Sequence, residues 1–154
     1  RPMRAVAILI KDKKVLLMHR EMDGKEYWVF PGGGVEENES VEDAVLRELQ
    51  KETSMKASVV KLLYHHHYTG SSDQYFYLCS YVSGKPKLDK FNEARSQEKG
   101  NDFYNPFWIE IDKLPSLLLY PLEIRDWLIK DFKNNFQNIP RKQSLKVDDL
   151  RQSK

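Results

Sequence analysis

The sequence predicts an α/β fold in which helices pack on a mixed or antiparallel β-sheet. Several short segments read as strands, because they are rich in β-branched and aromatic residues and are bounded by turn residues, whereas two segments have helical spacing. These strands and helices do not alternate strictly, as they would in a doubly wound parallel sheet. The 154 residues fit one domain, since a chain of that size buries roughly 70% of its unfolded surface.

The first predicted strands form a hairpin. They cover residues 4–10 and 15–20, and the polar segment around Asp12 between them predicts the connecting turn. A third short strand, at residues 27–30, ends where Pro31 and three glycines follow. The chain therefore leaves its first strands through a segment that is unusually free of side chains.

The first predicted helix covers residues 40–53. Ser40 suits its N-terminus, because a serine hydroxyl accepts a hydrogen bond from a free N–H of the first turn. Apolar residues recur at helical spacing and predict a buried stripe of Val41, Ala44, Val45 and Leu49. A second helix is predicted from Pro121, since proline is tolerated in a first turn.

Three further strands are predicted at residues 56–68, 74–83 and 107–111. Residues 84–103 hold two glycines, a proline and many charges, and predict a long loop. After Phe136 the chain turns polar and has little apolar surface to bury. We therefore expect one domain over residues 1–136 and a polar tail over residues 137–154 that is flexible or packed on a partner.

Composition excludes several classes of protein. A single cysteine rules out an internal disulfide and a cysteine-rich zinc site. No apolar run approaches the roughly 20 residues of a membrane helix, so we expect a soluble, cytoplasmic protein without a membrane partner. The 25 basic and 23 acidic residues give a net charge of +2, which is too balanced to indicate a nucleic-acid partner.

The segment from Pro31 to Met55 combines glycines with carboxylates. Three consecutive glycines permit positive φ and leave the backbone open to a ligand. The carboxylates that follow are Glu36, Glu37, Glu39, Glu42, Asp43, Glu48 and Glu52. Glu48 and Glu52 share a helix face and repel each other, which indicates a cation between or above them. Oxygen ligands suit Mg²⁺, Mn²⁺ or Ca²⁺, although a solvated acidic face would have the same composition.

The spacing within this segment resembles the Nudix box of Nudix hydrolases, G-x5-E-x7-R-E-U-x-E-E-x-G-U, where U is bulky and apolar. The matching positions are Gly33, Glu39, Arg47, Glu48, Leu49, Glu52 and Met55. The resemblance covers about residues 3–133. It implies a Nudix-type α/β/α sandwich with a mixed β-sheet and a loop–helix–loop catalytic motif. It also implies hydrolysis, dependent on Mg²⁺ or Mn²⁺, of a diphosphate linkage in a nucleoside diphosphate joined to another moiety.

The resemblance assigns roles to the candidate catalytic residues. Glu52 matches the family's most constant metal ligand, and Glu48 matches a second ligand or the base that deprotonates water. The carbonyl of Gly32 matches a backbone ligand. Arg47 matches an arginine that pairs within the box, in this chain with Glu39, and orients the loop.

Further candidates lie outside the helix. A metal ligand from a later loop is expected in many members, and Glu93 and Glu98 are the choices, with Glu98 nearer the final strand. The candidate substrate-binding residues are Gly33, Gly34, Lys51, Tyr27 and Phe103. The two aromatic residues are proposed because a nucleobase can stack on an aromatic ring.

Two positions depart from the family pattern. Lys51 stands where the family has a glutamate, and Ser54 where it has a glycine. Lys51 removes one oxygen ligand and weakens a metal site by Coulomb repulsion, or else its ammonium contacts phosphate directly. The alternative to an active hydrolase is therefore a catalytically weakened Nudix domain that acts as a nucleotide-binding or regulatory module.

The substrate stays open at this stage. The possible substrates are an oxidised nucleoside triphosphate, ADP-ribose or another nucleotide sugar, a dinucleoside polyphosphate and an RNA 5′ end. We expect a small-molecule nucleotide as the partner, and nucleic acid only as an RNA 5′ end. Members of the family often pair, so a homodimer is also an expectation. The run from His65 to His67 places two imidazoles on one strand face and one on the other. Without a third ligand, it predicts an ordinary strand.

Overall fold

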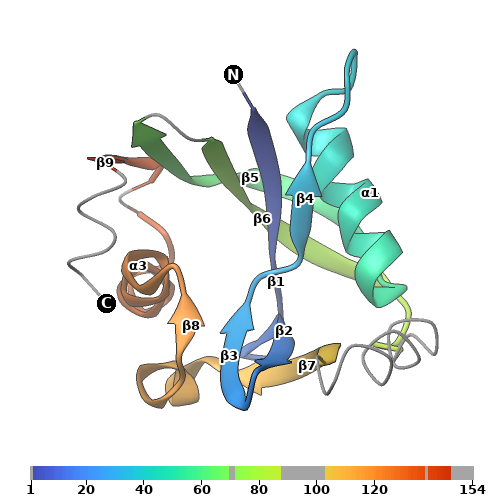
Figure 1. Cartoon of the computed structure of the whole chain (residues 1–154), viewed down its shortest axis with the longest axis vertical. Coiled ribbons are helices and arrows are strands. Elements are labelled where there is room, and N and C mark those ends of the chain that lie inside the picture. Colours follow the sequence, from blue (N-terminus) through green and yellow to red (C-terminus); the bar gives the residue numbers. More distant parts are fainter. Residues whose placement is uncertain (1, 70–71, 88–102, 138, 147–154) are drawn as a thin grey trace.

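The structure, a computed structural model, describes residues 2–69, 72–87, 103–137 and 139–146 (Figure 1). The elements in chain order are β1 (Met3–Lys11), β2 (Lys14–Met22), β3 (Lys25–Val29), β4 (Gly32–Gly34), α1 (Val41–Thr53), β5 (Lys56–Thr69), β6 (Asp73–Ser83), β7 (Phe103–Glu110), the 3₁₀ helix η1 (Ile111–Ser116), β8 (Leu119–Tyr120), α3 (Leu122–Lys133) and β9 (Arg141–Lys146). None of the helices in these ranges has the length and apolar character needed to cross a membrane.

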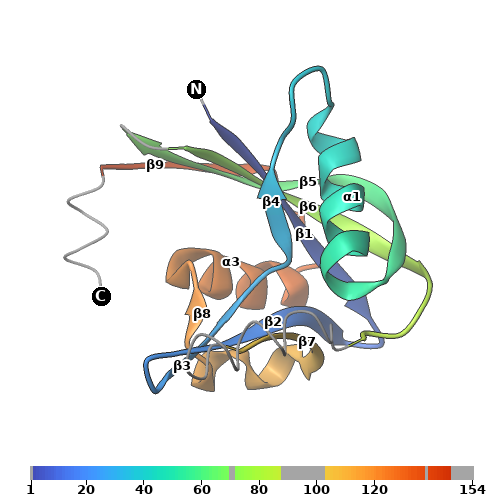
Figure 2. The ribbon, with the colours of Figure 1, turned by 45° about the vertical axis from the view of Figure 1, so that its right-hand side comes forward.

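The described strands form one mixed sheet. Its order is β8-β3-β2-β1-β6-β5-β9, with β4 paired to β1 and β7 paired to β2. β1 pairs with β2 only near Ile10 and Lys11, whereas β4 takes the place beside it along Arg4, Ala5 and Val6. The sheet therefore splays into two leaves, β1 with β4, β5, β6 and β9, and β2 with β3 and β7 (Figure 2).

Helices cover both faces of the sheet. α1 packs its apolar stripe, including Ala44, Val45 and Leu49, on small residues of β1. α3 lies between the two leaves on the opposite face (Figure 2), where its Ile124 and Leu128 join a second apolar cluster with Ile111 and Leu114 of η1. The Nudix-type α/β/α sandwich expected from the sequence is thus confirmed, and Glu52 of α1 reaches Tyr104 on β7 of the other leaf.

Both ends of α1 match the predicted helix. The Oγ of Ser40 accepts a hydrogen bond from the backbone N–H of Asp43 at 3.1 Å. Ser54 ends the helix with φ of 64°, a left-handed conformation that glycine adopts at lower cost. Ser54 therefore adopts the left-handed conformation that suits the glycine of the family pattern.

β7 begins at Phe103, four positions before the strand predicted from residue 107. Pro106 lies within this strand, although proline donates no hydrogen bond to a neighbouring strand. Among the described strands, however, β7 pairs only with β2. It is an edge strand, where a missing N–H is tolerated.

β9 is a strand that the sequence does not predict. Residues 141–146 were assigned to a flexible or partner-packed tail, but they pair in parallel with Tyr64–Thr69 of β5. The segment has no apolar alternation to reveal a strand. Arg141 instead anchors it through an ion pair to Asp131 of α3 at 2.6 Å. The domain boundary at residue 136 remains a prediction, and residues 147–154 lie outside the described residues.

Candidate active site

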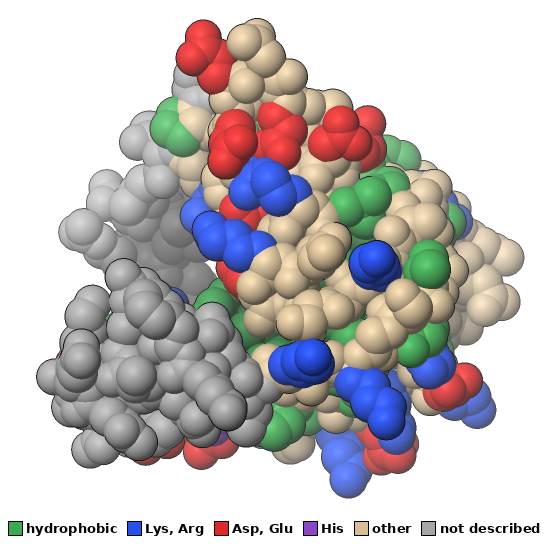
Figure 3. Space-filling view, turned by 90° about the vertical axis from the view of Figure 1, so that its right-hand side faces the viewer, with side chains coloured by type: hydrophobic (Ala, Val, Ile, Leu, Met, Phe, Trp, Pro, Cys, Tyr) green, Lys and Arg blue, Asp and Glu red, His purple; other side chains and the backbone are tan. Residues whose placement is uncertain are grey.

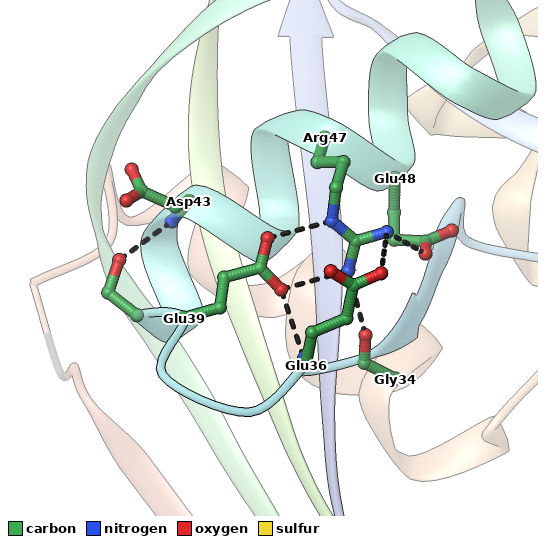
Figure 4. Close-up of polar contacts among 7 residues, drawn as sticks. Gly34, Glu36, Glu39, Asp43, Arg47 and Glu48 are labelled. Atoms are coloured by element: carbon green, nitrogen blue, oxygen red, sulfur yellow. Dashed lines mark hydrogen bonds and ion pairs between the residues drawn. The ribbon is translucent and has the colours of Figure 1, made fainter.

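The guanidinium of Arg47 joins the glycine-rich strand, the following loop and α1 (Figure 4). Its Nε and Nη2 donate to the two carboxylate oxygens of Glu39, at 2.7 and 2.9 Å. Its Nη1 donates to Oε1 of Glu48 at 2.7 Å, and Nη2 also donates to the carbonyl of Gly34 at 3.0 Å. Glu36 completes the group with an ion pair of 3.7 Å. The predicted pairing of Arg47 with Glu39 is therefore present.

Glu39 in turn shapes the loop. The backbone N–H of Glu36 donates to Oε1 of Glu39 at 3.0 Å, and the N–H of Glu39 donates to the carbonyl of Glu36 at 3.1 Å. The hydrogen bonds from Arg47, and then from the Glu36 backbone, lower the pKa of Glu39 to about 2. The loop is thus held around a carboxylate that stays ionised at neutral pH.

Two of the three glycines of β4 are required by close packing. None of the three has positive φ, which corrects the expectation, since all lie in the extended strand β4. A Cβ on Gly33 would lie 2.5 Å from Cδ of Glu48, and one on Gly32 would lie 2.6 Å from the carbonyl oxygen of Ala5. Gly33 therefore lets the buried Glu48 carboxylate lie against the strand. Gly34 has open space around it.

Glu52 lies one turn beyond Glu48 in a different environment. The hydroxyl of Tyr104, on β7, donates to its Oε2 at 2.8 Å. Burial, with a smaller contribution from the Glu48 charge, raises the pKa of Glu52 to about 7, against the hydrogen bonds from Tyr104 and the Gly32 backbone. Glu52 thus changes protonation near neutral pH, or keeps its charge if a cation binds.

The two carboxylates fit a hard divalent cation. All candidate donors are oxygens, namely those of Glu48 and Glu52 and the carbonyl of Gly32, which is the donor set that Mg²⁺ and Mn²⁺ prefer. A cation there would offset the repulsion that contributes to the raised pKa of Glu52. Figure 3 shows further Asp and Glu side chains, with Lys and Arg side chains beside them, on the face formed by α1.

A cavity of about 400 Å³ adjoins this site. Arg4 and Arg20 supply positive charge to its wall, and Phe30 and Phe76 supply apolar surface. Tyr104 also lines it and, through its hydrogen bond, connects the cavity to Glu52. Its volume is within the range of small-molecule sites. Such a mixture suits a ligand that carries both phosphate and a flat apolar part.

The sequence did not identify Arg4, Arg20 or Tyr104 as site residues. Arg4 and Arg20 are ordinary strand residues in the sequence, and Tyr104 is one of eight tyrosines. The guanidinium of Arg20 lies 5.0 Å from the centre of the Tyr104 ring, a cation–π distance. Only the pairing of β2 with β7 brings the two together, opposite each other in register.

Other predicted residues lie apart from the cavity or outside the described residues. Lys51 is exposed on α1. Tyr27 is absent from the cavity wall, although its ring packs edge-on against Tyr120, which lines it, at 5.9 Å. The side chain of Phe103 lies outside the described residues, as do Glu93 and Glu98.

Fold and site together define a class of protein, an α/β/α sandwich that presents an acidic helix beside a glycine-rich strand and a basic cavity. The chain belongs to the NUDIX domain family, whose model matches residues 1–129. The resemblance drawn from the box is thereby confirmed.

Named relatives agree with this assignment. An RNA pyrophosphohydrolase of Teredinibacter turnerae is 46% identical over 48 residues, which are 31% of this chain and 28% of the relative. One of Pelagibacter ubique is 24% identical over 151 residues, covering 87% of this chain and 89% of the relative. A crystal structure of a UDP-X diphosphatase superposes with a TM-score of 0.67 at 20% identity, over 92% of this chain and 66% of that one. The match to the first relative therefore spans less than a third of its length.

Proposed function

We propose that this protein is a divalent-metal-dependent hydrolase of the diphosphate linkage in a nucleoside diphosphate joined to another moiety. The observation that carries the proposal is the position of Glu52, which shares a helix face with Glu48 and is held by a residue of the basic cavity. Carboxylates that hold a cation beside arginines that hold phosphate are the combination that phosphoryl chemistry requires.

The residues divide the work between them. Glu48, Glu52 and the Gly32 carbonyl would hold Mg²⁺ or Mn²⁺, which supplies Lewis acidity and lowers the pKa of bound water. Arg4 and Arg20 would bind phosphate oxygens from the cavity side. Arg47 is a positioning residue, because it fixes Glu48 through its 2.7 Å hydrogen bond without reaching the cavity.

Tyr104 is a second positioning residue, since its hydroxyl orients the Glu52 carboxylate. Glu52 is also one candidate for the group that accepts a proton from the attacking water. Glu48 is the other candidate for that proton. The loop carboxylates Glu93 and Glu98 remain candidates for a further ligand.

The substrate class follows in part from the relatives. The curated relatives named above are RNA pyrophosphohydrolases, which makes an RNA 5′ end a substrate to test. The similar UDP-X diphosphatase structure points to uridine diphosphate derivatives. The cavity of about 400 Å³ favours a single nucleotide unit in either case.

The alternative function, a weakened nucleotide-binding or regulatory module, rests on Lys51. Lys51 lies three positions after Glu48 and so next to it on the helix surface, but Lys51 is exposed whereas Glu48 is buried. The ammonium therefore extends into solvent instead of occupying the place of a buried carboxylate. This arrangement favours an active enzyme whose cation site has one ligand fewer.

A substrate panel separates the two functions. The panel contains a 5′-triphosphorylated RNA, ADP-ribose, a UDP-sugar, a dinucleoside polyphosphate and an oxidised nucleoside triphosphate, each with Mg²⁺ or Mn²⁺. We expect turnover by the natural chain and a loss of at least about 100-fold in kcat for Glu52→Gln. Asp43→Asn is the matched control, since Asp43 is an exposed carboxylate of the same helix, and should keep activity.

Two results would contradict the hydrolase. Equal activity in Glu52→Gln and Asp43→Asn would remove Glu52 from the chemistry. Turnover by Lys51→Glu alone, with none by the natural chain, would identify a weakened domain. The homodimer and the cytoplasmic location remain predictions, and sedimentation of the purified chain tests the first.

A further inference from the structure

A second group of metal-binding side chains lies where the β5–β6 hairpin closes. His65 and His67 are two positions apart on β5 and so face the same side of the sheet. Asp73, the first residue of β6, is paired with His67 across the two strands. The sequence offered only the two histidines for this face. The β5–β6 hairpin brings Asp73 to the two histidines as a third candidate ligand.

The three ligand atoms converge. Nε2 of His65 lies 3.2 Å from Oδ1 of Asp73, and Nδ1 of His67 contacts the same oxygen. All three atoms lie within 4.8 Å of one another. The His65 ring stacks on Tyr75, with centroids 4.3 Å apart and planes inclined by 13°, which holds the imidazole in place.

The three side chains are partly buried but still accessible to an ion from solvent. The exposed fractions of the side chains of His65, His67 and Asp73 are 20%, 27% and 12%. Partial burial orders the ligands before an ion arrives, while the remaining exposure leaves it a path and room for water. A site with three protein ligands and one water is an arrangement typical of zinc.

The chemistry differs from that of the acidic helix. Two imidazoles with one carboxylate suit Zn²⁺ and other divalent transition metals, whereas Mg²⁺ prefers oxygen donors alone. Neighbouring ligand atoms of a tetrahedral zinc site are about 3.3 Å apart, given bonds of about 2.0–2.1 Å. The separation of 3.2 Å between His65 and Asp73 is close to that value.

The group is also separate from the candidate active site. Gln74 lines the cavity, and its neighbour Asp73 must face the other side of the sheet because strand side chains alternate. None of the three residues lines the cavity. In Figure 1 the hairpin end lies beside β9, at the opposite side of the molecule from the C-terminal end of α1.

We propose that His65, His67 and Asp73 bind a divalent transition-metal ion, with Zn²⁺ as the expected ion, at a site distinct from the acidic helix. The ion would tie β5 to β6. It would also help to hold the segment before β1 in place, because the backbone N–H of Asp73 donates to the carbonyl of Pro2 at 3.0 Å. Zinc would therefore raise the free energy of unfolding, because it binds the folded chain alone.

Zinc binding by the full chain tests the proposal. Equilibrium dialysis against Zn²⁺ in excess Mg²⁺, which occupies the acidic helix, should give one equivalent of zinc. Mutation of partners beyond the ligands of a metal costs about 10- to 100-fold in affinity, so losing a ligand in His67→Gln or His65→Gln should cost at least about tenfold. Zinc should raise the melting temperature of the natural chain and of Glu52→Gln, but not of the two histidine variants.

His19→Gln is the matched control. His19 also faces a carboxylate, Glu26, at 2.8 Å, and its side chain has the same exposed fraction as that of His65, 20%. The control should bind zinc as the natural chain does. The proposal is overturned if the natural chain binds no zinc under these conditions, if His19→Gln loses as much affinity as His67→Gln, or if Glu52→Gln removes the zinc. Circular dichroism of each variant shows that it is folded before its affinity is compared.

Discussion

Two arginines of this protein bind carboxylates through the same chemistry in contrasting surroundings. Arg47 binds Glu39 and Glu48, whose side chains keep exposed fractions of 15% and 8%. Arg141 binds Asp131 of α3, whose side chain is fully buried. The first network holds acidic groups in place for a ligand. The second fastens a strand to a helix, and the difference lies in how much water each network excludes.

The Asp131 network is complete within the protein. Arg141 donates from Nε and Nη2 to both carboxylate oxygens, at 2.9 and 2.6 Å, and the hydroxyl of Tyr64 donates to Oδ2 at 2.9 Å. Burial, followed by the hydrogen bond to Asp131, raises the pKa of Tyr64 above its usual value. A buried carboxylate with this many donors depends on all of them, since water cannot replace one.

The largest effect is therefore expected from Arg141→Gln. Removing the cation leaves the buried Asp131 charge without its partner, which should lower the free energy of unfolding by about 3 kcal/mol. Urea unfolding measures it, and Lys142→Gln, an exposed neighbour on the same strand, is the control. A loss of less than about 1 kcal/mol, the usual value of a surface pair, would show that the two networks do not differ.

Arg47→Gln should destabilise the protein less, by about 1 kcal/mol, because the Glu39 and Glu48 side chains keep 15% and 8% exposure whereas Asp131 has none. Expressed as free energies, the loss in kcat/KM should exceed the loss in the free energy of unfolding, since Glu48 loses the hydrogen bond that orients it. Steady-state kinetics and urea unfolding on one preparation compare the two. Arg47→Lys, which cannot bind Glu39 through two parallel hydrogen bonds, should also lose activity; full activity in it would show that charge alone suffices.

The smallest effect is a pH dependence from Glu39. Its pKa falls from 4.5 when unfolded to about 2 when folded. Its contribution to stability is therefore present above pH 4.5 and is lost as the pH falls through about 2. Melting temperatures of the natural chain and Glu39→Gln should converge over that interval. Glu37→Gln, an exposed loop control, should show no such convergence, and a constant difference for Glu39→Gln would refute the assignment.

What could be predicted from sequence follows the same division. The Arg47 network belongs to one loop and one helix, which carry the resemblance to the Nudix box, so Glu39, Arg47, Glu48 and Glu52 could be selected in advance from that resemblance. The glycine-rich segment was predicted to be part of the site, but the reason given for its glycines, positive φ, was wrong. Gly33 is required because a Cβ there would collide with the Glu48 carboxylate. No local sequence pattern reveals that contact.

Contacts between distant segments escaped prediction. Tyr104 lies 52 positions from Glu52, and Tyr64 lies 67 positions from Asp131. Such pairs depend on which strands are neighbours, and strand order is not encoded in periodicity. Asp73 joined His65 and His67 for the same reason, since only the hairpin register aligns them. A basic segment such as residues 141–146 gives no strand signal until its partner strand is known.

The position of β9 has a consequence for the behaviour of this protein in solution. A bare strand edge offers unpaired N–H and C=O groups to other chains and so promotes aggregation. β9 covers the Tyr64–Thr69 stretch of β5 and replaces it as the outer strand with a segment that holds Arg141, Lys142 and Lys146. Positive charge discourages a further strand from adding there. A chain shortened to residue 136 would lose this cover, and it would be prone to associate through β5 even if its active site were intact.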